Sequence, residues 1–129
     1  MPRRHSPLAA LALLGALLAA GCGKELPPAV DTGDAGRQLD AALAAWKDGK
    51  SHESLAAGEP PVIFNEPLWK EGAKLVAYEL GEVTLHGRQG RCTAKLTLRG
   101  KDGRQYERKI GYQIDTVPRV VIVRENLGM

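Results

Sequence analysis

The sequence predicts an α+β domain, in which an N-terminal helix packs on a curved, four-stranded antiparallel sheet. Two patterns predict this fold. Apolar residues recur at helical spacing between residues 34 and 48, and from Lys74 onward apolar and polar residues alternate with a period of two. Alternating strands bury one face of a sheet and leave the other in water. The helix is the large apolar surface that could cover the buried face, which gives two layers.

The predicted helix carries one apolar stripe. Leu39, Leu43 and Trp46 recur at positions i, i+4 and i+7, and the alanines between them favour a helix. Asp34 is the expected N-cap, because its carboxylate can accept hydrogen bonds from the free N–H groups of the first turn. Gly49 follows the last apolar position and suits the left-handed conformation that often ends a helix.

A short edge strand and then four longer strands are expected after the helix. Pro60 and Pro61 force an extended backbone ahead of the apolar run 62–64, which fits an edge strand. The apolar parity changes at Gly81, which indicates a β-bulge there. Asp102-Gly103 predicts a tight hairpin turn. The four longer strands are expected at 74–85, 91–99, 105–114 and 120–123.

This order of elements resembles cystatin-like folds, in which an antiparallel sheet wraps around a helix. The resemblance is in element order alone. The chain has no cystatin inhibitory motif, so the resemblance implies neither site residues nor an activity.

The first 22 residues are organised like an export signal. Arg3 and Arg4 give a positive start, and an apolar run of 13 residues, 8–20, follows. That run is shorter than the roughly 20 residues that a helix needs to span a bilayer, and it fits the core of a signal peptide. Residues 18–22, Leu-Ala-Ala-Gly-Cys, resemble the lipobox of bacterial lipoproteins. The resemblance implies cleavage before Cys22 and acyl chains on its sulfur, which attach the protein to a membrane.

The expected organisation follows from that resemblance. A cleaved signal peptide covers residues 1–21, a lipidated cysteine and flexible tether cover 22–33, and a single domain covers 34–129. In lipoproteins an Asp after the cysteine favours retention in the inner membrane, whereas this chain has Gly23. The expected location is therefore the bacterial cell envelope, with the outer membrane facing the periplasm slightly favoured.

The charge balance gives little support to a nucleic-acid partner. The chain has 18 basic and 15 acidic residues, a formal net charge of +3. The signal removes Arg3 and Arg4, which leaves 16 − 15 = +1. No basic run is interleaved with aromatic residues, as nucleic-acid binding would require. Once Cys22 is lipidated, Cys92 is the remaining cysteine and cannot form an intramolecular disulfide; its apolar parity predicts a buried side chain.

No motif in the sequence predicts catalysis, a metal site or a cofactor. Gly49-Lys50-Ser51 resembles the end of a phosphate-binding loop, but position 44 is Ala44, inside the predicted helix. His52 and His86 lie far apart and have no cysteine or carboxylate at ligand spacing. We therefore expect a protein that is not an enzyme.

Two candidate binding sites remain. The first is the polar face of the sheet, where four basic side chains could bind an anionic or hydroxyl-rich envelope polymer or an envelope protein: Arg91, Lys95, Arg99 and Lys109. The simpler interpretation of that face is solubility, because exposed ion pairs contribute little. The second arises because Arg108 breaks the apolar parity of its strand. An inward Arg108 could line a small-ligand pocket between helix and sheet together with Tyr78, Tyr106, Tyr112 and Trp69.

The sequence thus predicts a membrane-anchored envelope lipoprotein with a small, non-enzymatic binding domain. The alternative is a small-ligand-binding domain with its pocket near Arg108.

Overall fold

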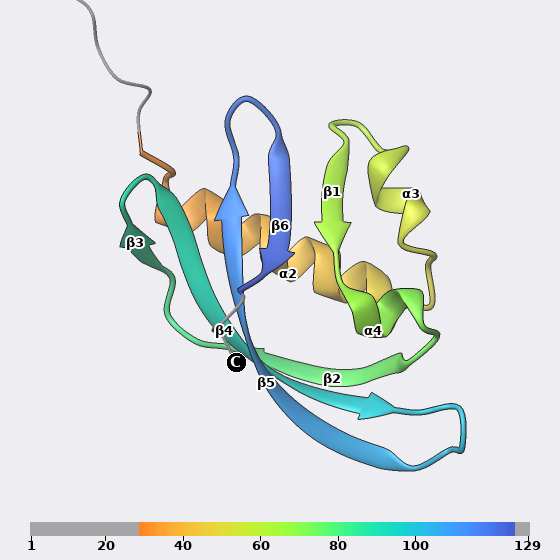
Figure 1. Ribbon diagram of the computed structural model, residues 1–129. Helices are drawn as coiled ribbons and strands as arrows, with labels where there is room; N and C mark the ends of the chain where they lie inside the picture. Colours follow the sequence, from red (N-terminus) through yellow and green to blue (C-terminus); the bar gives the residue numbers. More distant parts are fainter. Residues whose placement is uncertain (1–28, 126–129) are drawn as a thin grey trace, which may run out of the picture.

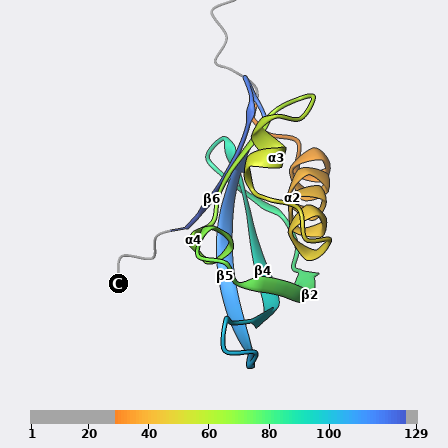
Figure 2. The same ribbon diagram turned by 90° about the vertical axis from the view of Figure 1, so that its right-hand side faces the viewer.

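A helix lies across one face of a curled, six-stranded sheet (Figure 1). The computed structural model describes residues 29–125. The strand order is β1-β6-β5-β4-β2, and β3 pairs with β4 beside β2. Seen along the sheet edge, the helix α2 stands on one side of β4, β5 and β6 (Figure 2). The α+β class is confirmed, whereas the expected count of four strands is wrong. The strands are β1 (Val62–Asn65), β2 (Lys74–Leu80), β3 (Thr84–His86), β4 (Gln89–Arg99), β5 (Gln105–Asp115) and β6 (Val120–Arg124).

The helix α2 (Thr32–Lys47) begins earlier than its expected cap. Asp31 is the N-cap, and its carboxylate accepts a hydrogen bond of 3.3 Å from the backbone N–H of Asp34. Val30 is buried, and its N–H donates to the carbonyl of Arg88 at 3.0 Å. Folded structure therefore starts at least four residues before Asp34, inside the stretch expected to be tether. At the other end Gly49 has φ +84°, as its position after the helix predicted.

The longest strands, β4 and β5, form an antiparallel hairpin of 11 residues each. Their register runs from Gly90 opposite Ile114 to Arg99 opposite Gln105. Gly103 has φ +83° in the turn between them, which confirms the expected hairpin. Burial alternates strictly along β4 from Gly90 to Leu98, as expected. Both strands twist and bend strongly, so the sheet curls into a half-barrel around α2 (Figure 1).

The bulge lies near the start of β2 and not at Gly81. The register with β4 shifts between Leu75 and Ala77. The extra residue, Val76, turns Leu75 into the core and places Lys74 opposite Arg99 on the polar face. At Gly81 the strand ends instead, with a last hydrogen bond of 2.9 Å from its N–H to the carbonyl of Thr93.

The chain then forms β3, which the sequence analysis had merged with β2. A two-residue turn connects β3 to β4, and its Gly87 has φ +64°. This turn, Gly87-Arg88, lacks the Asn-Gly or Asp-Gly pair that marks such hairpins in a sequence.

The expected edge strand is confirmed as β1, but its pairing makes the sheet mixed. β1 runs parallel to β6, with Val62 opposite Val120 and Phe64 opposite Ile122. The continuous apolar run of β6 fits a strand shielded on both faces, because Val120 and Ile122 are buried in the core and Val121 and Val123 are partly buried on the other face. Two single-turn helices flank β1: α3 (Glu53–Ala56) before it and α4 (Pro67–Lys70) after it.

The core fills the space between α2 and the concave face of the sheet. Close contact between the layers depends on Gly90, because a Cβ added there would lie 3.2 Å from the Cβ of Ala35. The fully buried side chains with the largest volume come from both layers: Leu39, Leu43, Leu96, Leu98, Tyr112, Ile114 and Ile122. Among residues 29–125, no helix combines the length and apolar character that a bilayer crossing requires. Cys22 and the expected signal peptide lie outside the described residues.

Candidate functional site

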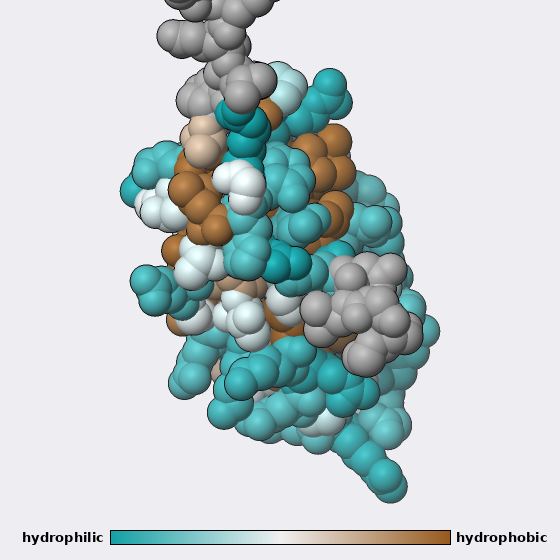
Figure 3. Space-filling model, turned by 60° about the vertical axis from the view of Figure 1, so that its left-hand side comes forward, coloured by the Kyte–Doolittle hydropathy of each residue, from teal (hydrophilic) through white to brown (hydrophobic). Residues whose placement is uncertain are grey.

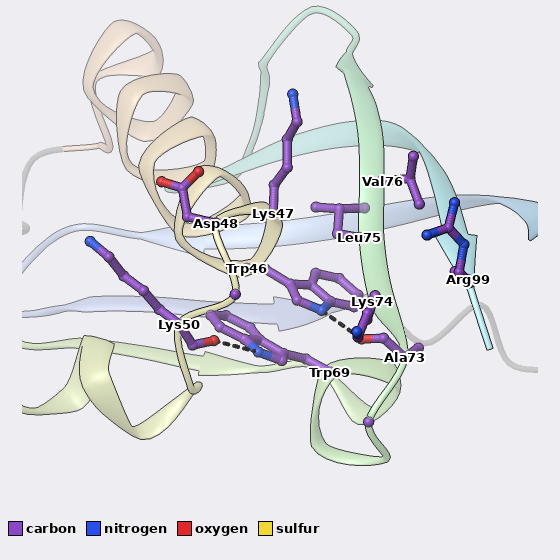
Figure 4. A pocket seen from close by; sticks show the side chains of 12 residues that line it. Trp46, Lys47, Asp48, Lys50, Trp69, Ala73, Lys74, Leu75, Val76 and Arg99 are labelled. Carbon is purple, nitrogen blue, oxygen red and sulfur yellow. Dashed lines mark hydrogen bonds between the residues drawn. The ribbon is translucent and has the colours of Figure 1, made fainter. Parts of the chain in front are cut away.

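A hollow of about 560 Å³ opens where α2 ends, between the end of that helix, α4 and β2 (Figure 4). Two tryptophans form its floor. Trp46 ends the apolar stripe of α2, and Trp69 comes from α4. The other lining residues are Lys47, Asp48, Gly49, Lys50, Gly72, Ala73, Lys74, Leu75, Val76 and Arg99.

The two indole rings are stacked, with centroids 5.5 Å apart and planes inclined by 11°. Each ring nitrogen donates to a backbone carbonyl, Trp46 to Ala73 at 2.9 Å and Trp69 to Lys50 at 3.1 Å. Both side chains are buried in the core. A buried indole needs a partner for its N–H, and these bonds fix both rings in place. The tryptophans are therefore a rigid floor and not an open stacking platform.

Basic side chains surround this floor. Lys47, Lys50, Lys74 and Arg99 are exposed at the hollow, against one carboxylate, Asp48. Figure 4 shows the side chain of Lys47 at the end of α2, that of Lys50 on the loop after it and that of Arg99 on the far side of β2. Within residues 29–125, none of these four cations has a carboxylate within 4 Å. The residues lining the hollow thus carry a net formal charge of +3.

Two of the four cations face each other across neighbouring strands. Lys74 on β2 and Arg99 on β4 are register partners. Like charges directly opposite each other on a sheet destabilise the pairing. Arg99 donates to the amide oxygen of Gln105 at 3.1 Å, which is a neutral partner. A bound anion would relieve this repulsion, so the pair favours an anionic ligand.

The predicted basic face is present, but two of its four cations, Arg91 and Lys95, are paired with carboxylates. Arg91 lies 3.0 Å from the carboxylate of Glu125 and 3.0 Å from the ring of His86. Lys95 lies 3.9 Å from Glu107, and Glu79 is its register partner on β2. On the neighbouring strand β5, Lys109 lies opposite Lys95. Of the four predicted residues, Arg99 is the one that borders the hollow.

The five residues predicted around an Arg108 pocket do not come together. Arg108 is exposed, with its guanidinium 4.8 Å from the ring centroid of the half-buried Tyr106. Tyr78 donates to Asp40 of α2 at 2.8 Å, and Trp69 belongs to the hollow. Tyr112 is fully buried. The parity break at Arg108 lies where β5 has lost its outer neighbour. Among the described residues, β6 pairs with residues 112–115 of β5 and not with the end that carries Arg108, whereas Leu96, opposite Arg108 on the inner strand β4, is fully buried.

A buried carboxylate that the sequence analysis missed supports the floor. Glu66 is 1% exposed and caps α4, accepting from the N–H of Leu68 at 2.7 Å. Its oxygens also accept from the hydroxyl of Tyr112 and from Arg124, both at 2.5 Å. Burial, and then the charge of Glu66, raise the pKa of Tyr112 above its usual range. Glu66 before Pro67 at the start of a helix was the available signal, because proline favours the first helical position.

The remaining candidates have structural roles. Cys92 is buried, as expected, with its Sγ 3.4 Å from the carbonyl oxygen of Gly81. Burial raises the pKa of this thiol, which lowers its reactivity. Among the described residues, no three His, Cys, Asp or Glu side chains cluster in a way that could hold a metal ion.

A comparison of the chain with protein-family models, with curated proteins and with solved structures found no match. The hollow and its charges are therefore the features from which a function can be inferred.

Proposed function

We propose that this protein is a lipid-anchored domain of the bacterial envelope that binds an anionic polymer at the tryptophan-floored hollow, without catalysing a reaction. The observation that carries the proposal is the uncompensated pair Lys74 and Arg99, opposite each other at the hollow with Lys47 and Lys50 nearby. The polymer's defining chemistry is a series of carboxylate or phosphate groups.

The spacing of the cations favours a polymer over a single small anion. They project from the end of α2, from the loop after it, from β2 and from β4. An exposed ion pair is worth about 0.2–1 kcal/mol, so one such contact cannot hold a ligand. Several contacts made together by one chain of anionic groups can add up to useful affinity. An extended ligand would follow the open hollow from Lys50 towards Arg99.

The envelope location and the lipid anchor rest on the lipobox resemblance of residues 18–22. A cell-wall polymer or an envelope protein with acidic segments would be within reach of such an anchored domain. The resemblance to cystatin-like folds concerns the order of elements alone and implies no ligand.

The test is co-sedimentation of the full-length lipoprotein, in detergent, with two insoluble probes: purified peptidoglycan, which carries carboxylates, and resin-bound polyphosphate. We expect the wild-type protein to sediment with at least one of them. Added salt should release it, because raising the salt concentration from 0.15 M to 1 M shortens the screening length from about 8 Å to about 3 Å. The double variant Lys74→Gln/Arg99→Gln should bind about 10-fold more weakly, which corresponds to about 1.4 kcal/mol.

The matched control is Lys95→Gln/Lys109→Gln, which removes the same charge from the same sheet at a distance from the hollow. Equal losses in both double variants would show that net charge and not the hollow drives binding, and would overturn the proposal. Failure of the wild type to bind either probe would overturn it as well.

The anchor has its own test. The Cys22→Ser variant should lose radiolabelled palmitate and leave the membrane fraction, whereas Cys92→Ser should keep both. Equal labelling of wild type and Cys22→Ser would refute a lipid on Cys22.

A further inference from the structure

One end of the domain combines the point where the chain joins the fold with exposed apolar and basic loops. The N–H of Val30 binds the carbonyl of Arg88, so the start of the fold is fixed to the β3–β4 turn. The loop between β5 and β6 lies beside it, because Val30, Arg88 and Val117 line one shared hollow of about 540 Å³. We call this surface the N-terminal end; it comprises Leu85, Arg88, Val117 and Arg119.

Two of the three large apolar side chains that are exposed among residues 29–125 lie at this end. Val117 is 61% exposed at the tip of the β5–β6 loop, and Leu85 is 46% exposed on β3. Figure 3 shows apolar surface just below the place where the chain reaches the described part. A single exposed apolar residue is ordinary, but two beside a membrane attachment point are positioned to contact lipid.

The basic residues of this end have no acidic partner. Arg88 and Arg119 are exposed, and neither has a carboxylate within 4 Å among the described residues. The nearby Asp115 accepts a hydrogen bond of 3.2 Å from Gln89, and Asp31 lies 3.9 Å from Arg37. At a bilayer surface, exposed apolar side chains can insert among the acyl chains while neighbouring basic side chains bind anionic headgroups. The N-terminal end carries both kinds of side chain.

The length of chain before the fold keeps this end near the bilayer. Six residues lie between Cys22 and Ala29, and the seven Cα–Cα steps that join them span at most about 3.6 Å each, or about 25 Å. The 16-residue helix α2 then leads away from this end and is about 24 Å long. The tryptophan-floored hollow lies at its far end.

We propose that the N-terminal end docks on an anionic lipid surface, with Val117 and Leu85 at the acyl boundary and Arg88 and Arg119 on headgroup phosphates, so that the hollow points away from the membrane. This inference rests on the proposed lipid anchor at Cys22. It is independent of what the hollow binds.

The experiment measures the depth of labelled positions in vesicles. Full-length acylated protein with the background change Cys92→Ala is reconstituted into vesicles of phosphatidylethanolamine and phosphatidylglycerol. An environment-sensitive fluorophore is attached at Val117→Cys or, as the control, at Arg104→Cys in the β4–β5 hairpin at the other end of the sheet. We expect quenching by a bilayer-embedded quencher to be several-fold stronger at position 117. Equal quenching at both positions, or stronger quenching at position 104, would overturn the docking.

Charge reversal tests the role of the arginines. With the label at position 117, Arg88→Glu/Arg119→Glu should lower quenching several-fold, as should vesicles of phosphatidylcholine alone. The matched control Lys101→Glu/Lys109→Glu, which changes the same charge elsewhere, should leave it unchanged. Equal effects of the two double variants would overturn the assignment to these arginines.

The intact mass of the purified protein separates this proposal from the one on which it rests. A protein without acyl chains overturns the anchor, and the docking with it. A protein that carries acyl chains but shows no difference between positions 117 and 104 overturns the docking alone.

Discussion

Glu66 joins α4, which carries Trp69, to the centre of the sheet. Its carboxylate caps α4, which carries Trp69, and binds Tyr112 of β5 and Arg124 of β6. A buried charge is tolerated when hydrogen bonds satisfy it, and removal of one partner leaves a costly unpaired oxygen. The cluster thereby fixes a short helix, which would be unstable alone, to the centre of the sheet.

Tyr112→Phe should destabilise the protein by about 1–3 kcal/mol, because it removes a donor from buried Glu66 and keeps the ring. Tyr106→Phe is the control, since Tyr106 is half-buried and no hydrogen bond of its hydroxyl is found within residues 29–125. Urea unfolding measures both free energies. Equal values for the two variants would contradict the role assigned to the Glu66 cluster.

Ionisation of Tyr78 should lower the stability of the folded protein at alkaline pH. Burial, and then its hydrogen bond to Asp40, raise the pKa of Tyr78 from 10.0 to about 12. The folded state therefore holds this proton at a pH where the unfolded chain has released it, so the free energy of unfolding falls as pH rises. The fall should begin near pH 10 and level off above about pH 12.

Denaturant unfolding across that range should show a shallower decline for Tyr78→Phe than for the wild type. The raised pKa of Tyr112 acts in the same direction and should remain in the variant. Parallel declines in the two proteins would refute the assignment to Tyr78.

At the scale of elements, the start of α2 is set by Asp31 and not by Asp34. Asp31 accepts from the N–H of Asp34, whereas Asp34 lies within the first turn, 3.6 Å from Arg37. Asp31→Ala should cost about 1 kcal/mol of stability, as the loss of an N-cap does. Asp34→Ala should cost less, because it removes an exposed ion pair. Thermal unfolding measures the loss of stability in both variants. A larger loss for Asp34→Ala than for Asp31→Ala would show that Asp34 is the N-cap, as the sequence predicted.

Local patterns predicted the elements that depend on neighbouring residues. The helix followed from its apolar stripe, the alternation of β4 from period two, and the β4–β5 turn from Asp102-Gly103. The parallel pairing of β1 with β6 could not be predicted this way, because it joins residues almost 60 positions apart. The bulge at Val76 had the same difficulty, since nothing local places it ahead of Gly81.

The hollow could be predicted only in part, because its residues are brought together by tertiary structure. Trp46 was predicted as a core residue, but its stacking on Trp69 depends on the position of α4. Lys74 faces Arg99 only because the bulge shifts the register of β2 by one residue. Without that shift, Leu75 would be opposite Arg99. Arg99 was predicted as a binding residue, whereas its cationic neighbours became visible through tertiary structure.

At the scale of the whole molecule, α2 separates two surfaces with different proposed partners. In the docking proposed above, the N-terminal end faces lipid, and the tryptophan-floored hollow lies at the far end of the helix. The helix between the two surfaces is about 24 Å long.

The measurement that tests the hollow most directly is an NMR titration of the two indole N–H signals. Trp46 and Trp69 are the two tryptophans of the chain, and both lie at the floor of the hollow. With a soluble anionic polymer such as short-chain polyphosphate, we expect both signals to shift in the wild type and in Lys95→Gln/Lys109→Gln. They should stay unchanged in Lys74→Gln/Arg99→Gln. Binding that leaves both indole signals unmoved in the wild type would place the ligand elsewhere and contradict the proposed function.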